Sequence, residues 1–110
     1  ALSGDLGAGK TTFVQGFAKG LGIKDKIISP TFVLIRQHPI PNITKILYHI
    51  DLYRLENPED FKGLGLEEIL SNPENIVLIE WAEKAKKLPA NTINIRFENL
   101  GDSKRQIIVS

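Results

Sequence analysis

The pattern that most limits what this chain can fold into lies within its first eleven residues. Residues 4–11 read Gly-Asp-Leu-Gly-Ala-Gly-Lys-Thr and fit G-x-x-x-x-G-K-[ST]. In this arrangement a strand enters a glycine-rich loop that leads into a helix, and the loop's N–H groups surround a phosphate. Glycine allows that close approach because it has no side chain. We therefore predict a strand ending at Leu2 and Ser3, a phosphate-binding loop, and a helix from Lys10.

The side chains of this loop have distinct expected roles. Lys10 should reach the β- and γ-phosphates of a nucleotide, and the Thr11 hydroxyl should bind Mg²⁺. A chance match in a glycine-rich turn has a probability of about 0.5% in a chain of this length. The nucleotide-binding residues that we expect from the loop are Asp5, Leu6, Gly7, Ala8, Gly9, Lys10, Thr11 and Thr12.

Hydrophobic periodicity predicts the remaining elements. An apolar stripe at helical spacing follows the loop, from Phe13 to Leu21, and Gly20 and Gly22 should end that helix. Further helical segments should begin at Asn57 and cover 66–70 and 82–87. The expected strands are 31–37, 45–53, 76–79, 92–97 and 106–109, with the first two antiparallel and 76–79 central.

These elements alternate in the manner of an α/β protein. We expect a P-loop NTPase-like three-layer domain with a mixed parallel and antiparallel central sheet, spanning residues 1–110. The glycine-rich loop normally follows a complete buried strand, whereas only three residues precede it here. We therefore expect that the domain is N-terminally truncated, lacking an upstream strand and helix.

Two acidic residues could serve a metal ion or the attacking water. Glu80 follows the most apolar run of the chain, Ile76 to Ile79, and Asp51 follows a second expected strand. Ligands of open α/β sheets gather at the carboxyl ends of strands, so either acid could bind the metal. The segment 29–32 (SPTF) follows the first helix, where nucleotide switches often place a γ-phosphate sensor, so Thr31 could contact Mg²⁺ or the γ-phosphate.

Aromatic and histidine residues carry weaker signals. Trp81 could belong to the core or could stack on a base or a partner surface. His38 and His49 are more readily explained as packing or surface residues than as catalysts. Tyr48, Tyr53 and most phenylalanines are expected in the core.

Composition excludes several classes of protein. Hydrophobic residues make up 42% and charged residues 25% of the 110 residues, as in an ordinary globular domain. The net charge of +1 gives no broad electrostatic reason to expect nucleic-acid or membrane binding. No cysteine is present, which excludes disulfides and thiolate metal sites. No apolar run approaches the roughly 20 residues that a membrane-spanning helix needs.

Four segments together resemble the TsaE family, formerly YjeE, of small bacterial ATPases required to make threonylcarbamoyladenosine in tRNA. The glycine-rich loop alone is common to many families, but the combination is specific, and its order and spacing match from Leu2 to at least Lys84. The matching segments are 4–12 (GDLGAGKTT), 29–32 (SPTF), 49–54 (HIDLYR) and 79–84 (IEWAEK).

The resemblance implies a cytoplasmic protein that binds ATP and Mg²⁺ and hydrolyses ATP weakly. Its partners would be TsaB and TsaD, whose complex ATP hydrolysis is thought to reset, with tRNA involved only indirectly. Lys10, Asp51 and Glu80 would be the catalytic residues. Thr11 and Glu80 would hold the metal, Asp51 would be the second essential acid, and Trp81 matches a tryptophan needed for function.

Three other functions remain to be weighed. A small nucleotide or metabolite kinase needs a lid bearing arginines, and the four arginines here are dispersed. A GTPase would need glycine at position 54, where Arg54 stands, and an Asn-Lys-x-Asp motif that does not occur. A non-catalytic, nucleotide-gated interaction module would use the bound state itself, with hydrolysis incidental.

Overall fold

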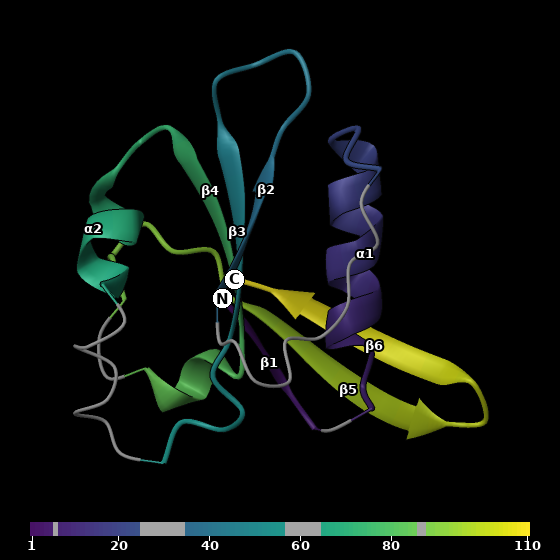
Figure 1. The fold of residues 1–110 in the computed structure, drawn as a ribbon. Helices are drawn as coiled ribbons and strands as arrows, with labels where there is room; N and C mark the ends of the chain where they lie inside the picture. The colour runs from purple at the N-terminus through teal and green to yellow at the C-terminus, as the bar shows by residue number, and fades with distance from the viewer. Residues whose placement is uncertain (6, 25–34, 57–64, 86–87) are drawn as a thin grey trace.

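The computed structural model describes residues 1–5, 7–24, 35–56, 65–85 and 88–110, which form one six-stranded sheet with helices on both faces (Figure 1). Six strands, two α-helices and one 3₁₀ helix make up the described chain. In order they are β1 (Leu2–Gly4), α1 (Lys10–Gly20), β2 (Ile35–Pro39), β3 (Ile46–Asp51), α2 (Leu66–Ser71), β4 (Asn75–Glu80), η2 (Ala82–Lys84), β5 (Ile95–Gly101) and β6 (Lys104–Val109).

The sheet has the strand order β2-β3-β4-β1-β5-β6. Strand β1 runs parallel to both of its neighbours, β4 and β5, and β3 runs parallel to β4. The two outer pairs, β2 with β3 and β5 with β6, are antiparallel. The predicted mixed sheet is therefore confirmed, with the strand that enters the glycine-rich loop in its interior.

Two hydrophobic cores lie on opposite faces of the sheet. Val14 and Ala18 of α1 pack with Leu2, Leu47 and Leu78 on one face. Leu66 of α2 and Ala82 of η2 pack with Ile50, Leu52 and Ile79 on the other. Figure 1 shows α1 and α2 on either side of the strands. The three layers follow from the alternation of side chains along β3 and β4.

The same alternation aims the polar side chains at the strand ends. Because Leu47 and Leu78 face α1, residues two and four positions away face α1 as well, which places His49, Asp51 and Glu80 on that side. Asp51 and Glu80 are directly opposite each other in the β3–β4 register. The fold thus brings both predicted acids to the carboxyl ends of the parallel strands, where the glycine-rich loop begins.

Several predicted boundaries shift in the structure. Strand β2 extends to Pro39, β5 begins at Ile95 rather than Thr92, and the helical piece after Trp81 is a single 3₁₀ turn. Residues 31–34 and the helix expected from Asn57 lie outside the described residues. No described helix has the length and hydropathy to cross a membrane.

The expectation that Tyr53 lies in the core is wrong, and among the described phenylalanines Phe17 is exposed. The exposed fraction is 48% for Tyr53 and 36% for Phe17. Tyr53 follows the last residue of β3 by two positions, beyond the region that α1 covers. Phe17 lies at the edge of the apolar stripe of α1, whose buried positions are Lys10, Val14 and Ala18.

Gly4 provides a test of how closely β1 packs against β5. A Cβ at this position would lie 2.3 Å from the carbonyl oxygen of Phe97, and the Gly4 φ of +133° disfavours any other residue. We expect Gly4→Ala to lower the free energy of unfolding by about 3 kcal/mol or more. Urea unfolding monitored by circular dichroism measures this.

The matched control is Gly16→Ala in the exposed part of α1, where an added Cβ meets nothing within 4 Å. It should raise the free energy of unfolding by about 1 kcal/mol, the difference in helix propensity. Equal effects of the two substitutions would contradict the close approach at Gly4.

Candidate functional site

The glycine-rich loop places an uncapped helix N-terminus beside the end of the sheet. Gly7 and Gly9 have positive φ values of 79° and 111°, which bend the chain from β1 into α1. Gly9 is the N-cap of α1, and no side chain caps this end within the described part of the loop. The first N–H groups of α1 therefore point out of the helix, an arrangement that suits an anion.

Lys10 folds back over this loop. Its Nζ donates hydrogen bonds to the carbonyl oxygens of Gly4 (2.5 Å) and Asp5 (2.9 Å). The ammonium group also lies 4.0 Å from the centroid of the Trp81 ring, a cation–π contact. Only 5% of the residue is exposed. The cation is thus held at the mouth of the loop, where a phosphate would bind.

Burial lowers the pKa of Lys10 below its ordinary value of 10.5, because the charged form loses hydration. Nearby carboxylates oppose this decrease in pKa by stabilising the ammonium, in the order Glu83, Glu80, Asp5 and Asp51. The net decrease shows that desolvation outweighs these carboxylates in setting the pKa of Lys10.

Glu80 is the centre of a hydrogen-bonded group that joins three elements. Its Oε1 accepts a hydrogen bond from the Thr11 hydroxyl at 2.9 Å, which connects β4 to α1. Its Oε2 lies 2.5 Å from Nε2 of His49, which connects β4 to β3. The exposed fraction is 2% for Glu80 and 0% for His49. Both carboxylate oxygens therefore have partners inside the protein.

Asp51 lies in the adjacent strand and has a different set of contacts. Its Oδ1 accepts a hydrogen bond from the backbone N–H of Tyr53 at 2.9 Å, which stabilises the turn after β3. The residue is 5% exposed. The two acids thus have different contacts. Glu80 accepts a hydrogen bond from Thr11 of α1, and Asp51 stabilises the turn that follows β3.

The pair of Thr11 and Glu80 fits two ligands of a magnesium ion. Mg²⁺ binds six oxygen atoms octahedrally at about 2.0–2.1 Å, so that adjacent ligands are separated by about 2.9 Å. The two oxygen atoms here are 2.9 Å apart. No cluster of three His, Cys, Asp or Glu residues suited to a metal occurs among the described residues. An ion at this position would take its other ligands from phosphate oxygens and water, as Mg²⁺ commonly does.

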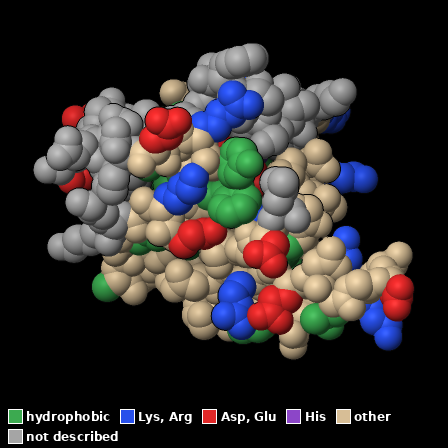
Figure 2. Space-filling model, turned by 90° about the horizontal axis from the view of Figure 1, so that it is seen from below, with side chains coloured by type: hydrophobic (Ala, Val, Ile, Leu, Met, Phe, Trp, Pro, Cys, Tyr) green, Lys and Arg blue, Asp and Glu red, His purple; other side chains and the backbone are tan. Residues whose placement is uncertain are grey.

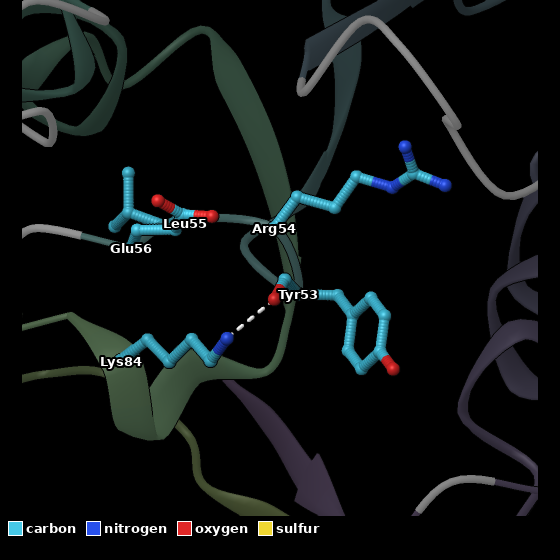
Figure 3. A pocket seen from close by; sticks show the side chains of 5 residues that line it. All are labelled: Tyr53, Arg54, Leu55, Glu56 and Lys84. Atoms are coloured by element: carbon cyan, nitrogen blue, oxygen red, sulfur yellow. Dashed lines mark hydrogen bonds between the residues drawn. The ribbon is translucent and has the colours of Figure 1, made fainter.

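An aromatic pair extends the site to the surface. The rings of Tyr53 and Trp81 lie 5.1 Å apart, and Lys84 donates a hydrogen bond to the Tyr53 carbonyl. Tyr53 and Lys84 also line a pocket of about 900 Å³, together with Arg54, Leu55 and Glu56 (Figure 3). Figure 2 views the end of the molecule where β1, β3 and β4 finish, and hydrophobic side chains lie there among basic and acidic ones.

Most of the predicted site residues come together at this end of the sheet. Lys10, Thr11, Glu80 and Trp81 are linked by the contacts above, and Asp51 lies beside Glu80 in the register. The other described loop residues are Asp5, Gly7, Ala8, Gly9 and Thr12. Leu6 and Thr31 lie outside the described residues, so their predicted nucleotide contacts stay predictions.

His49 is the member of this group that our sequence reasoning did not include. It was expected to be a packing or surface residue, and it is a fully buried partner of Glu80. Its position could have suggested this, because His49 is two residues before Asp51 and must face the same side of the sheet.

Comparisons with known proteins identify the family and agree with the fold. The family model "Threonylcarbamoyl adenosine biosynthesis protein TsaE" matches residues 1–107. The tRNA threonylcarbamoyladenosine biosynthesis protein TsaE of Nostoc sp. is 46% identical, over 96% of this chain and 65% of that protein. The protein of that name from Treponema pallidum is 43% identical, over 99% of this chain and 78% of its own length.

A solved structure is also similar. The crystal structure of Bacillus subtilis YdiB aligns with a TM-score of 0.74 and 37% sequence identity, over 96% of this chain and 62% of that chain. The chain therefore spans about two thirds of the length of several proteins that it matches, including 65% of the Nostoc relative.

The lowered pKa of Lys10 predicts a specific dependence of stability on pH. Between the pKa in the folded protein and 10.5, the unfolded chain holds a proton on Lys10 that the folded protein releases. Raising the pH through this window therefore favours the folded state. We expect the wild type to gain stability relative to Lys10→Met as the pH rises toward 10.5, measured by urea unfolding at each pH.

Lys19→Met controls for the loss of one positive charge from the same helix, since Lys19 is exposed in the last turn of α1. If the Lys10 and Lys19 variants had the same pH dependence, the effect of burial on the pKa of Lys10 would be refuted.

Proposed function

Because the chain belongs to the TsaE family of threonylcarbamoyl adenosine biosynthesis proteins, we propose that it binds ATP with Mg²⁺ and hydrolyses it slowly. The observation that carries this proposal is the hydrogen bond between Thr11 and the buried Glu80. It places a hydroxyl and a carboxylate at magnesium-ligand spacing, directly beside a glycine-rich loop and its lysine.

Each residue of the site has a role in the proposed hydrolysis. Lys10 exchanges its contacts with the Gly4 and Asp5 carbonyls for the β- and γ-phosphates, and the N–H groups of the loop bind phosphate oxygens. Thr11 and Glu80 would hold Mg²⁺, which would supply positive charge beside the phosphate oxygens. Asp51 is the second acid, placed one strand away to orient the water that attacks the γ-phosphate in line.

We propose further that the protein acts in tRNA modification through other proteins. The family is one of threonylcarbamoyl adenosine biosynthesis, and the resemblance of the four motifs implies TsaB and TsaD as partners. ATP hydrolysis would reset their complex between turnovers, in the cytoplasm. The net charge of +1 supports protein rather than direct tRNA contacts, because tRNA binding normally needs a basic surface.

The role of Lys10 can be tested by nucleotide binding. We expect Lys10→Ala to raise the dissociation constant for ATP with Mg²⁺ by about 100-fold, because charged hydrogen bonds contribute about 1.5–3 kcal/mol each. Isothermal titration calorimetry measures the constant, with GTP titrated in parallel. Lys19→Ala, at the exposed end of the same helix, is the matched control and should bind as the wild type does. An unchanged constant for Lys10→Ala would refute the assigned role.

The two acids can be tested by separating binding from hydrolysis. We expect both Glu80→Ala and Asp51→Ala still to bind ATP, with a smaller gain in affinity from Mg²⁺ in Glu80→Ala, while phosphate release falls by about 100-fold, since charge in the transition state loses its stabilisation. Glu67→Ala, an exposed acid in the first turn of α2, is the control.

TsaB and TsaD should stimulate ATP hydrolysis by the wild type. The two acid variants, combined with the same partners, should fail to support tRNA modification. Full modification activity in both acid variants would mean that hydrolysis is dispensable and would favour a non-catalytic, nucleotide-gated module. Faster phosphate transfer to a small acceptor than to water would instead favour a kinase.

A further inference from the structure

His49 is a buried polar residue for which the proposed hydrolysis has so far given no role. It lies in β3 between Tyr48 and Ile50, with an exposed fraction of 0%. Its Nε2 is 2.5 Å from Oε2 of Glu80, and its Nδ1 has no hydrogen-bond partner within the part of the chain that the structure describes. Nε2 thus has a hydrogen-bond partner, whereas Nδ1 is buried with none among the described residues.

We propose that His49 is a positioning residue that fixes the orientation of the Glu80 carboxylate toward Thr11 and its metal ion. This inference rests on the proposed function, because it takes the oxygen that meets Thr11 as a magnesium ligand. It adds a requirement: a third element must orient the carboxylate of Glu80, and β3 supplies the residue that does so.

The geometry of the carboxylate supports this role. A glutamate side chain has three rotatable bonds, and ordering such a side chain costs up to about 2 kcal/mol of conformational entropy. Here Oε1 is bonded to Thr11 and Oε2 to His49, so that both ends of the planar group are fixed. With His49 in place, the Glu80 side chain is ordered before any ion binds. The entropic cost of ordering it therefore does not reduce the free energy of metal binding.

The hydrogen bond also gives the two ring nitrogens different roles. Nε2 serves as the donor to Glu80, because a carboxylate oxygen accepts. Nδ1 has no hydrogen-bond partner among the described residues. Partners of metal-binding carboxylates commonly act in this way, and their loss typically reduces metal affinity or activity 10- to 100-fold.

Packing alone does not account for a histidine at this position. Leu47, two residues earlier on the same face of β3, is completely buried and hydrophobic. A leucine would fill similar space without burying an unsatisfied nitrogen, which costs about 1–3 kcal/mol. The contact with Glu80, rather than packing, therefore accounts for a polar residue at this position.

The test uses two amide substitutions that differ in reach. In His49→Gln the amide nitrogen can occupy the position of Nε2 and donate to Glu80, whereas in His49→Asn it reaches only the position of Nδ1. The ATP dissociation constant of each variant is measured with Mg²⁺ and with EDTA. The ratio of the two constants reports the contribution of the metal separately from the fold and from turnover.

We expect the affinity gained from Mg²⁺ to fall by at least about 10-fold in His49→Asn and to stay within about 3-fold of wild type in His49→Gln. Binding in EDTA should be similar in all three proteins. The kcat should fall in His49→Asn and recover in His49→Gln. An unchanged gain from Mg²⁺ in His49→Asn would overturn the inference, as would an equal loss of affinity with Mg²⁺ and with EDTA.

A measurement on the wild type covers the case in which His49→Asn does not fold. The Nε2 proton should give a resolved imidazole N–H signal by ¹⁵N-edited NMR, and Mg²⁺ with ADP should shift it through Glu80. Absence of that shift, while Mg²⁺ tightens nucleotide binding, would overturn the positioning role alone. Failure of the wild type to bind ATP more tightly with Mg²⁺ would overturn this role together with the proposed function.

Discussion

The site depends on one buried carboxylate that is bonded to two different elements. Glu80 ends the central strand β4 and contacts α1 through Thr11 and β3 through His49. A buried carboxylate is unfavourable unless its oxygens are hydrogen-bonded, so the position of each partner is constrained by the others. The strand order enforces this, because β4 must lie between β3 and β1 for both contacts to form.

A buried cation accompanies this carboxylate at the same end of the sheet. Lys10 is bonded to two loop carbonyls rather than paired directly with an acid, while four carboxylates stabilise its charge from a distance. Carbonyl oxygens are weaker partners for an ammonium group than phosphates are. The arrangement keeps the lysine ordered and leaves it able to exchange these contacts for stronger ones, as the proposed nucleotide binding requires.

Much of this arrangement could be predicted from local patterns. The glycine-rich loop fixed the order of β1 and α1, and the apolar run before Glu80 identified the central strand. Residue patterns alone left open which acid meets Thr11, because this depends on the order of strands in space, and only the family resemblance pointed to Glu80. Asp51 and Glu80 both follow apolar strand segments, and their places in the sheet decide their contacts. His49 was missed for a related reason, since its partner is 31 residues away in the sequence.

Trp81 illustrates how a departure from regular structure completes the site. Consecutive side chains of a strand point to opposite faces, so an extended Trp81 would point away from Glu80 and Lys10. Its backbone instead is left-handed, with φ 57° and ψ 42°, a conformation that is unfavourable for a bulky residue. The ring thereby crosses the end of the sheet: it packs with the Ile50 and Leu52 core and lies 4.0 Å from the Lys10 ammonium. Two adjacent residues of one strand end thus supply the partner of Thr11 and the aromatic surface for Lys10, which a regular strand could not do.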